Sequence, residues 1–191
     1  MSQQAWQLVA DIGGTNARFA VLQVGQLESE YQFFYTVAEH ADFIELLAQL
    51  RRDIALATGW ANAPQRACLA VACPADGAEI KFTNSHWHFS KQEVERALES
   101  SVEIINDFAA IAHGVTELGA DDVIQVGGGT PQQDKPMAVL GPGTGVGVSA
   151  LLPHSGGYAV VDGEGGHVGF APGDTRQAAI LVGLQHRFGG H

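Results

Sequence analysis

Apolar residues recur along this chain in two spacings, and each spacing predicts a different kind of element. Apolar residues three or four positions apart over residues 43–57, followed by Gly59, predict a helix whose N-cap is Ala41 or Asp42. Ser90, with Glu93 as a capping-box partner, predicts a second helix as far as Leu98. Further helices are expected at residues 108–115 and from Asp174 or Thr175 to about Arg187.

Short apolar runs bounded by Gly, Pro or polar residues are typical of strands. They fall at residues 7–12, 18–24, 32–36, 68–72, 79–82, 102–105, 123–126, 137–140, 146–152 and 158–161. The first two are separated by a glycine-rich turn and should form a hairpin. Because helices and strands alternate, the fold class is α/β. A second round of strands begins after residues 114–120, which predicts a domain boundary there and divides the chain into residues 1–115 and 116–191.

Composition narrows the possible functions. Hydrophobic residues make up 46% of the 191 residues, enough for a sizeable core, and 10 basic against 21 acidic residues give a net charge of −11. This balance argues against nucleic-acid or anionic-membrane partners. The start of the chain lacks a signal-peptide pattern, and no apolar run approaches 18 residues. The two cysteines, Cys68 and Cys73, are expected to be free thiols in a reducing cytosol.

Two glycine-rich segments follow apolar strands and suit phosphate binding. In Asp11-Ile-Gly-Gly-Thr15-Asn16, backbone amides and the Thr15 hydroxyl suit a polyphosphate, and Asp11 suits the metal shell of a nucleotide. The sequence GPGTGVG at residues 141–147 lacks the Lys-Ser/Thr of a P-loop and the spacing of a Rossmann fingerprint. A phosphate-cradling hairpin with Thr144 as hydroxyl donor remains. For both segments, an ordinary tight hairpin turn is the alternative.

Two further segments carry groups suited to a hydroxyl substrate. Asn106-Asp107 ends a strand, where Asn can orient a hydroxyl and the carboxylate can accept its proton; a helix N-cap is the alternative, and both can hold together. Glu164 and His167 flank two glycines, so both side chains can converge on a small polyol. The two glycines argue against the helix that a di-iron site would need. His86 and His88 flank Trp87 and are expected to be surface or cleft-wall residues.

In their order and character, these four segments resemble those of the bacterial glucokinases, which have a hexokinase-like, actin-like ATPase (ribonuclease H-like) fold of two lobes. DIGGTNAR is similar to the first phosphate motif of that family, GPGTGVGV to the second, INDF to the segment of the catalytic aspartate and GEGGH to that of the sugar-binding Glu and His. LAVACP and TNSHWHFS are also similar to runs of the family, so the resemblance covers essentially the whole chain.

The resemblance implies phosphorylation of glucose by ATP with Mg²⁺ at the 6-hydroxyl, the first step of glycolysis, by a cytoplasmic enzyme that is a homodimer at full length. Asp107 would be the catalytic base. The implied sugar ligands are Asn84, Asn106, Asp107, Glu164 and His167. The implied phosphate-binding residues are Ala10, Asp11, Ile12, Gly13, Gly14 and Thr15, joined by Gly143, Thr144 and Gly145 of the second hairpin.

Members of this family are substantially longer, and their later part supplies another sugar-binding glutamate, an adenosine-side glycine motif and a helix that returns to the first lobe. We therefore expect residues 116–191 to be the first part of the larger lobe, and the 191-residue chain alone to be nearly inactive. The zinc motif and helix-turn-helix of related repressors are absent from the sequence, which disfavours a transcriptional sugar sensor. A kinase for another hexose or an amino sugar, a non-catalytic sugar-binding fragment and an actin-type structural protein are the alternatives.

Overall fold

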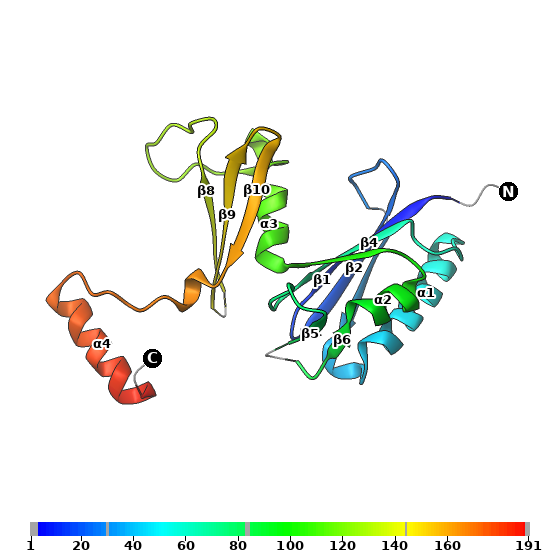
Figure 1. The fold of residues 1–191 in the computed structure, drawn as a ribbon, viewed down its shortest axis with the longest axis horizontal. Coiled ribbons are helices and arrows are strands. Elements are labelled where there is room, and N and C mark those ends of the chain that lie inside the picture. Colours follow the sequence, from blue (N-terminus) through cyan, green and yellow to red (C-terminus); the bar gives the residue numbers. More distant parts are fainter. Residues whose placement is uncertain (1–3, 30, 83–84, 144, 190–191) are drawn as a thin grey trace. The chain divides into compact units, whose positions relative to one another are not determined.

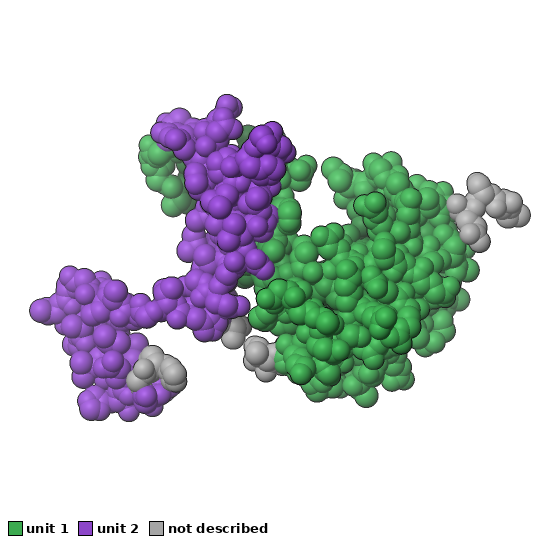
Figure 2. Space-filling view, in the orientation of Figure 1, with its two compact units in different colours: residues 1–129 green, residues 130–191 purple. Residues whose placement is uncertain are grey.

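The computed structural model describes residues 4–29, 31–82, 85–143 and 145–189 (Figure 1). The chain forms two compact units, unit 1 (Met1–Gly129) and unit 2 (Thr130–His191), which are coloured separately in Figure 2. The predicted boundary between residues 115 and 116 precedes the division between these units and stays a prediction. No helix within the described ranges is both long and apolar enough to cross a bilayer.

Unit 1 is built on a five-stranded mixed sheet of order β3-β2-β1-β4-β7. Strands β1 (Trp6–Ile12), β2 (Asn16–Gln23) and β3 (Tyr31–Thr36) are antiparallel neighbours, whereas β4 (Arg66–Val71) and β7 (Val102–Asn106) run parallel to β1. The predicted hairpin is confirmed, with Ile12 opposite Ala17 at its closed end. Parallel pairs need long crossover connections, and the segments with α1 and α2 provide them.

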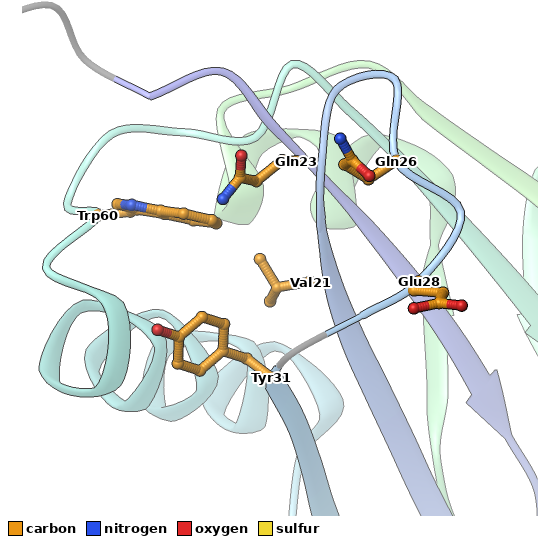
Figure 3. Close-up of a pocket in the computed structure, with 6 residues that line it drawn as sticks. All are labelled: Val21, Gln23, Gln26, Glu28, Tyr31 and Trp60. Atoms are coloured by element: carbon orange, nitrogen blue, oxygen red, sulfur yellow. The ribbon is translucent and has the colours of Figure 1, made fainter.

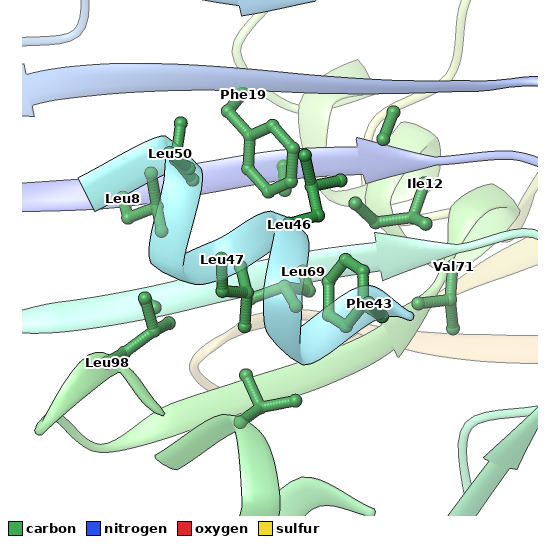
Figure 4. Close-up of a cluster of buried hydrophobic side chains, with 14 of the residues drawn as sticks. Leu8, Ile12, Phe19, Phe43, Leu46, Leu47, Leu50, Leu69, Val71 and Leu98 are labelled. Atoms are coloured by element: carbon green, nitrogen blue, oxygen red, sulfur yellow. The ribbon is translucent and has the colours of Figure 1, made fainter. Parts of the chain in front are cut away.

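Helix α1 (Phe43–Thr58) covers one face of this sheet because its apolar residues recur at helical spacing. Phe43, Leu46, Leu47, Leu50 and Ile54 are almost fully buried, and they pack with strand residues such as Leu8, Phe19 and Leu69 (Figure 4). Asp42 is the N-cap and accepts hydrogen bonds from the amides of Ile44 and Glu45 at 2.7 and 3.0 Å. Gly59 ends the helix in the left-handed conformation, at φ 76°. Both predicted ends are confirmed.

The remaining elements of unit 1 are short. Helix α2 (Lys91–Leu98) begins with the expected Ser90–Glu93 capping box, and α3 (Asp107–Val115) follows β7 directly. A small two-stranded sheet pairs β5 (Glu79–Lys81) with β6 (His88–Ser90), and two 3₁₀ turns lie at η1 (Val37–Glu39) and η2 (Ala120–Asp122). His88 contacts Glu79 at 2.8 Å, while the His86 ring bonds to the carbonyl oxygen of His40 at 2.9 Å.

Unit 2 contains an antiparallel sheet of order β10-β9-β8, formed by β8 (Met137–Pro142), β9 (Val146–His154) and β10 (Gly157–Gly163). A 3₁₀ turn, η3 (Gly165–His167), follows β10, and α4 (Thr175–Phe188) begins at the predicted N-cap Asp174. These three strands and this helix were all predicted.

The strand predicted at residues 123–126 is wrong. Val123, Ile124 and Val126 have 53%, 91% and 94% of their surface exposed, and no described strand pairs with them. An apolar run becomes a strand only where a neighbouring strand takes its backbone hydrogen bonds, and that condition is not visible in a local pattern.

Candidate active site

The carboxyl ends of β1, β4 and β7 meet at one edge of the sheet in unit 1. Ile12 lies opposite Val71, and Val71 lies opposite Asn106, so the three parallel strands end at the same level. The turn after Ile12 and the start of α3 at Asp107 therefore lie at the same edge. This is the position where open α/β sheets bind ligands, and it brings together two of the predicted motifs.

The first glycine-rich turn is closed by backbone hydrogen bonds at its base. The Gly13 amide donates to the Asn16 carbonyl at 2.9 Å, and the Val37 amide donates to the Thr15 carbonyl at 2.9 Å, which leaves Gly14 and Thr15 at the tip. The side chains of Ala10 and Ile12 point into the core, at 8% and 0% exposure, so only their backbone can be near a ligand.

Asp11 points to the opposite face of β1 from Ala10 and Ile12. Its carboxylate pairs with Arg18 across the hairpin, with Oδ2 and Nη1 3.0 Å apart and both side chains more than half exposed. Arg18 is thus a neighbour of the first glycine-rich turn that the sequence interpretation did not single out, although it lies inside the quoted DIGGTNAR motif. The sequence predicted the hairpin but not its register, and it is the register that places Arg18 directly opposite Asp11.

Asn106 holds the start of α3 in place. Its Oδ1 accepts the amides of Phe108 and Ala109 at 2.9 and 3.3 Å, and its Nδ2 donates to the Cys73 carbonyl at 3.4 Å. The helix-cap alternative is thus confirmed for this residue. The Asn106 side chain also hydrogen-bonds the Asp107 carboxyl, which lowers the pKa of that carboxyl and opposes part of its shift.

Asp107 is the first residue of α3 and is half-buried. Burial raises the pKa of its carboxyl, and the charge of Asp11 raises it further, while a hydrogen bond from the Phe108 amide opposes the shift. Asp107 in turn acts on its neighbour: burial first, and then the Asp107 charge, raise the pKa of Cys73 to about 11. A carboxylate with a raised pKa is better matched to taking a proton near neutral pH than an ordinary aspartate.

Unit 2 has a corresponding edge. Because β8 and β10 both run antiparallel to β9, their carboxyl ends lie together where β9 begins. The second glycine-rich turn leaves β8 at this edge, with Pro142 opposite Val146 and the Gly143 amide donating to the Gly145 carbonyl at 2.8 Å. A Cβ added at Gly143 or Gly145 would meet no described atom within 4 Å, and neither residue has a positive φ. Thr144, like Asn84, lies outside the described residues.

Glu164 and His167 lie at the same edge, immediately after β10. Their side chains contact each other, with Glu164 Oε2 3.0 Å from His167 Nδ1, and both are largely exposed. The glycines between them form the single 3₁₀ turn η3, which agrees with the predicted exclusion of an α-helix. The two polar groups therefore lie together at this edge, and their convergence on a polyol stays a prediction.

A pocket of about 270 Å³ in unit 1 lies away from these motifs. It is lined by Val21, Gln23, Gln26, Glu28, Tyr31 and Trp60 (Figure 3). Gln23 is paired with Trp6 at the amino end of β1, so the pocket is at the opposite end of the sheet from Asp107. Within the described ranges, no three His, Cys, Asp or Glu side chains gather as a metal site.

Comparison with solved structures identifies the class. A glucokinase from an Antarctic psychrotroph matches with a TM-score of 0.79 and 33% identity, over 98% of this chain and 59% of that one. A Balamuthia mandrillaris glucokinase in complex with glucose matches with a TM-score of 0.72 and 23% identity, over 97% and 56%. The fold is therefore that of the actin-like ATPase sugar kinases, as predicted.

Sequence comparison gives the family. The glucokinase family model matches residues 8–191, and the glucokinase of Chromobacterium violaceum is 40% identical over 189 residues. This chain belongs to the glucokinase family. The match covers 97% of this chain and 52% of the C. violaceum protein, so the chain spans about half the length of the curated relatives it matches.

Proposed function

We propose that the protein of which this chain is part transfers the γ-phosphoryl group of ATP to the 6-hydroxyl of glucose and forms glucose 6-phosphate. The observation that carries the proposal is the edge of unit 1 where a glycine-rich phosphate turn and a half-buried aspartate with a raised pKa occur together. The glucokinase relatives, one of which is described in complex with glucose, support the choice of sugar.

In this proposal Asp107 is the catalytic base. It accepts the proton of the attacking hydroxyl as the phosphoryl group moves, and the neighbouring side chain of Asn106, the N-cap of α3, orients that hydroxyl. Glu164 and His167 bind other sugar hydroxyls, because their carboxylate and imidazole already meet at one point of unit 2. Asn84 is proposed as a further sugar ligand on the family resemblance alone.

The two glycine-rich turns are the proposed phosphate sites. Catalysis of phosphoryl transfer depends mostly on positioning and on neutralising charge, and backbone amides at Gly14, Thr15, Thr144 and Gly145 can supply both. Gly143, whose amide closes the second turn, lets phosphate approach the backbone closely. The stretch from Ala10 to Ile12 places the first turn. Mg²⁺ typically binds proteins through one or two carboxylates together with substrate phosphates, and the half-exposed carboxylate of Asp11 beside the first turn fits that pattern. When bound there, the ion would offset phosphate charge.

The cellular setting is part of the same proposal. A role in the first step of glycolysis, a cytoplasmic location and a homodimer at full length follow from the family resemblance.

The test is a coupled assay of glucose 6-phosphate formation with the protein extended to the full family length, with mannose and glucosamine as competing substrates. We expect glucose-dependent release of ADP and the highest kcat/KM for glucose. A thermal-shift screen with the same sugars and ATP shows whether an inactive preparation is folded. A folded protein that binds none of the sugars and releases no ADP would contradict the proposal.

A further inference from the structure

The glycine pair of η3 lies directly against β9. A Cβ on Gly166 would overlap the carbonyl oxygen of Val146 and lie 2.9 Å from its carbonyl carbon; one on Gly165 would lie 2.9 Å from Cβ of Val148. Neither glycine has a positive φ. Gly166 is therefore needed for close approach of two backbones, and Gly165 for close approach to the Val148 side chain, rather than for an unusual backbone conformation.

Val146 lies at the base of the second glycine-rich turn in unit 2. It is the first residue of β9 and pairs with Pro142, so these two residues close the turn that carries Gly143 and Gly145. Turn η3 thus rests on the base of the second phosphate hairpin. At the two ends of η3 are Glu164 and His167, the proposed sugar ligands, joined by their 3.0 Å contact.

The contact between Gly166 and Val146 is one of main chain with main chain. A side chain at such a contact could adopt another rotamer, but the backbone of a hydrogen-bonded strand cannot yield without moving its neighbours. A shift of η3 therefore moves Val146, and Val146 moves Gly145, which precedes it, and Pro142, which pairs with it.

We propose that Gly166 and Val146 are positioning residues that couple sugar binding to the geometry of the second phosphate hairpin. Sugar bound by Glu164 and His167 fixes η3, and η3 fixes the hairpin in the form that binds the nucleotide. This inference rests on the proposed function and adds to it a physical connection between its two substrate sites. Coupling of binding is reciprocal, so the nucleotide must tighten sugar binding by the same factor.

The experiment measures this factor by calorimetry on the protein at full family length. The Kd of a non-hydrolysable ATP analogue is determined with and without saturating glucose, and the Kd of glucose with and without the analogue. We expect a factor of about 5 or more in the wild type, within the usual range for coupled sites. Gly166→Ala should reduce the factor towards 1, while each ligand alone still binds.

Gly169→Ala is the matched control, because a Cβ there meets no described atom within 4 Å, and it should keep the wild-type factor. If Gly166→Ala fails to fold, the variant Val146→Gly tests the inference instead. The Val146 side chain is 49% exposed, and its removal loosens the base of the hairpin without creating a clash. A folded variant at either position with undiminished coupling overturns the inference, as does a wild type that binds both ligands without coupling. A wild type that does not bind glucose refutes the proposed function itself.

Discussion

Replacing Asp107 by Asn tests the catalytic base with little change in shape. The amide oxygen of Asn can still accept the Phe108 amide, now bonded to Asp107 Oδ1 at 2.9 Å, and the Asn106 cap is untouched. Loss of general-base catalysis typically costs about 10²- to 10⁴-fold in rate, which corresponds to about 3–5 kcal/mol in the activation free energy. We expect kcat of the full-length protein to fall within that range and the KM for glucose to change little.

The same substitution should stabilise the fold at pH values above the raised pKa of Asp107 in the folded state. Because the pKa of Asp107 is raised in the folded state, the folded protein binds this proton more tightly than the unfolded chain does, and stability is lost as the pH rises through the folded pKa. Asn carries no charge and avoids that loss. Below the ordinary pKa of an aspartate the difference from the wild type should vanish.

Asn106→Ala provides the contrast, because it removes the cap of α3 and should destabilise the protein by about 1 kcal/mol. Thermal unfolding across pH, together with the coupled assay, measures both effects. An Asp107→Asn variant with near-normal turnover would refute the role as base. A lower Tm than the wild type at pH values above the folded pKa of Asp107 would mean that Asp107 serves to start the helix.

Three further predictions concern the surroundings of the base. The acid limb of the pH profile of kcat/KM should lie above the ordinary pKa of an aspartate. Asp11→Asn should move this limb to lower pH, because a negative charge beside Asp107 is removed. A limb that does not move would report the titration of another group. Glu164→Ala should raise the KM for glucose and weaken discrimination against deoxy analogues of glucose, since a site that hydrogen-bonds a hydroxyl strongly rejects substrates lacking that hydroxyl. A change only in the KM for ATP would assign this turn to the nucleotide. Gly143→Ala should leave Tm unchanged, because its Cβ meets no described atom within 4 Å, and should weaken nucleotide binding but not glucose binding measured alone. A fall in Tm with loss of both ligands would support an ordinary hairpin.

Local patterns were enough to predict most elements of the fold. Helix α1 could be predicted at both ends because its cap, its apolar spacing and its terminal Gly59 are all local. The three strands of unit 2 could be predicted because glycines mark the turns between them. Residues 123–126 were misjudged because strand formation depends on a partner that a local pattern does not contain.

The candidate site was only partly predictable for the same reason. Asp107 could be identified from its place at the end of a strand. That Asn106 lies beside Val71, and Val71 beside Ile12, depends on parallel pairing between distant segments. The raised pKa of Asp107 depends on the burial of its carboxyl and on the charge of Asp11. The close approach of Gly166 to Val146 joins two residues that are 20 positions apart in the sequence.

The environment of Cys73 makes this residue a native reporter of the candidate site. Thiol reagents react with the thiolate, and burial together with a pKa of about 11 keeps Cys73 protonated and shielded at neutral pH. Labelling then has to wait for a local opening of the sheet edge, just as amide exchange does. Its carbonyl accepts the Asn106 side chain, so an opening that releases Cys73 also releases the residue that starts α3. The substitution Cys68→Ala leaves Cys73 as the one thiol in this chain. The labelling rate of Cys73 then measures how often the sheet edge that carries Asp107 opens, and no added probe is needed.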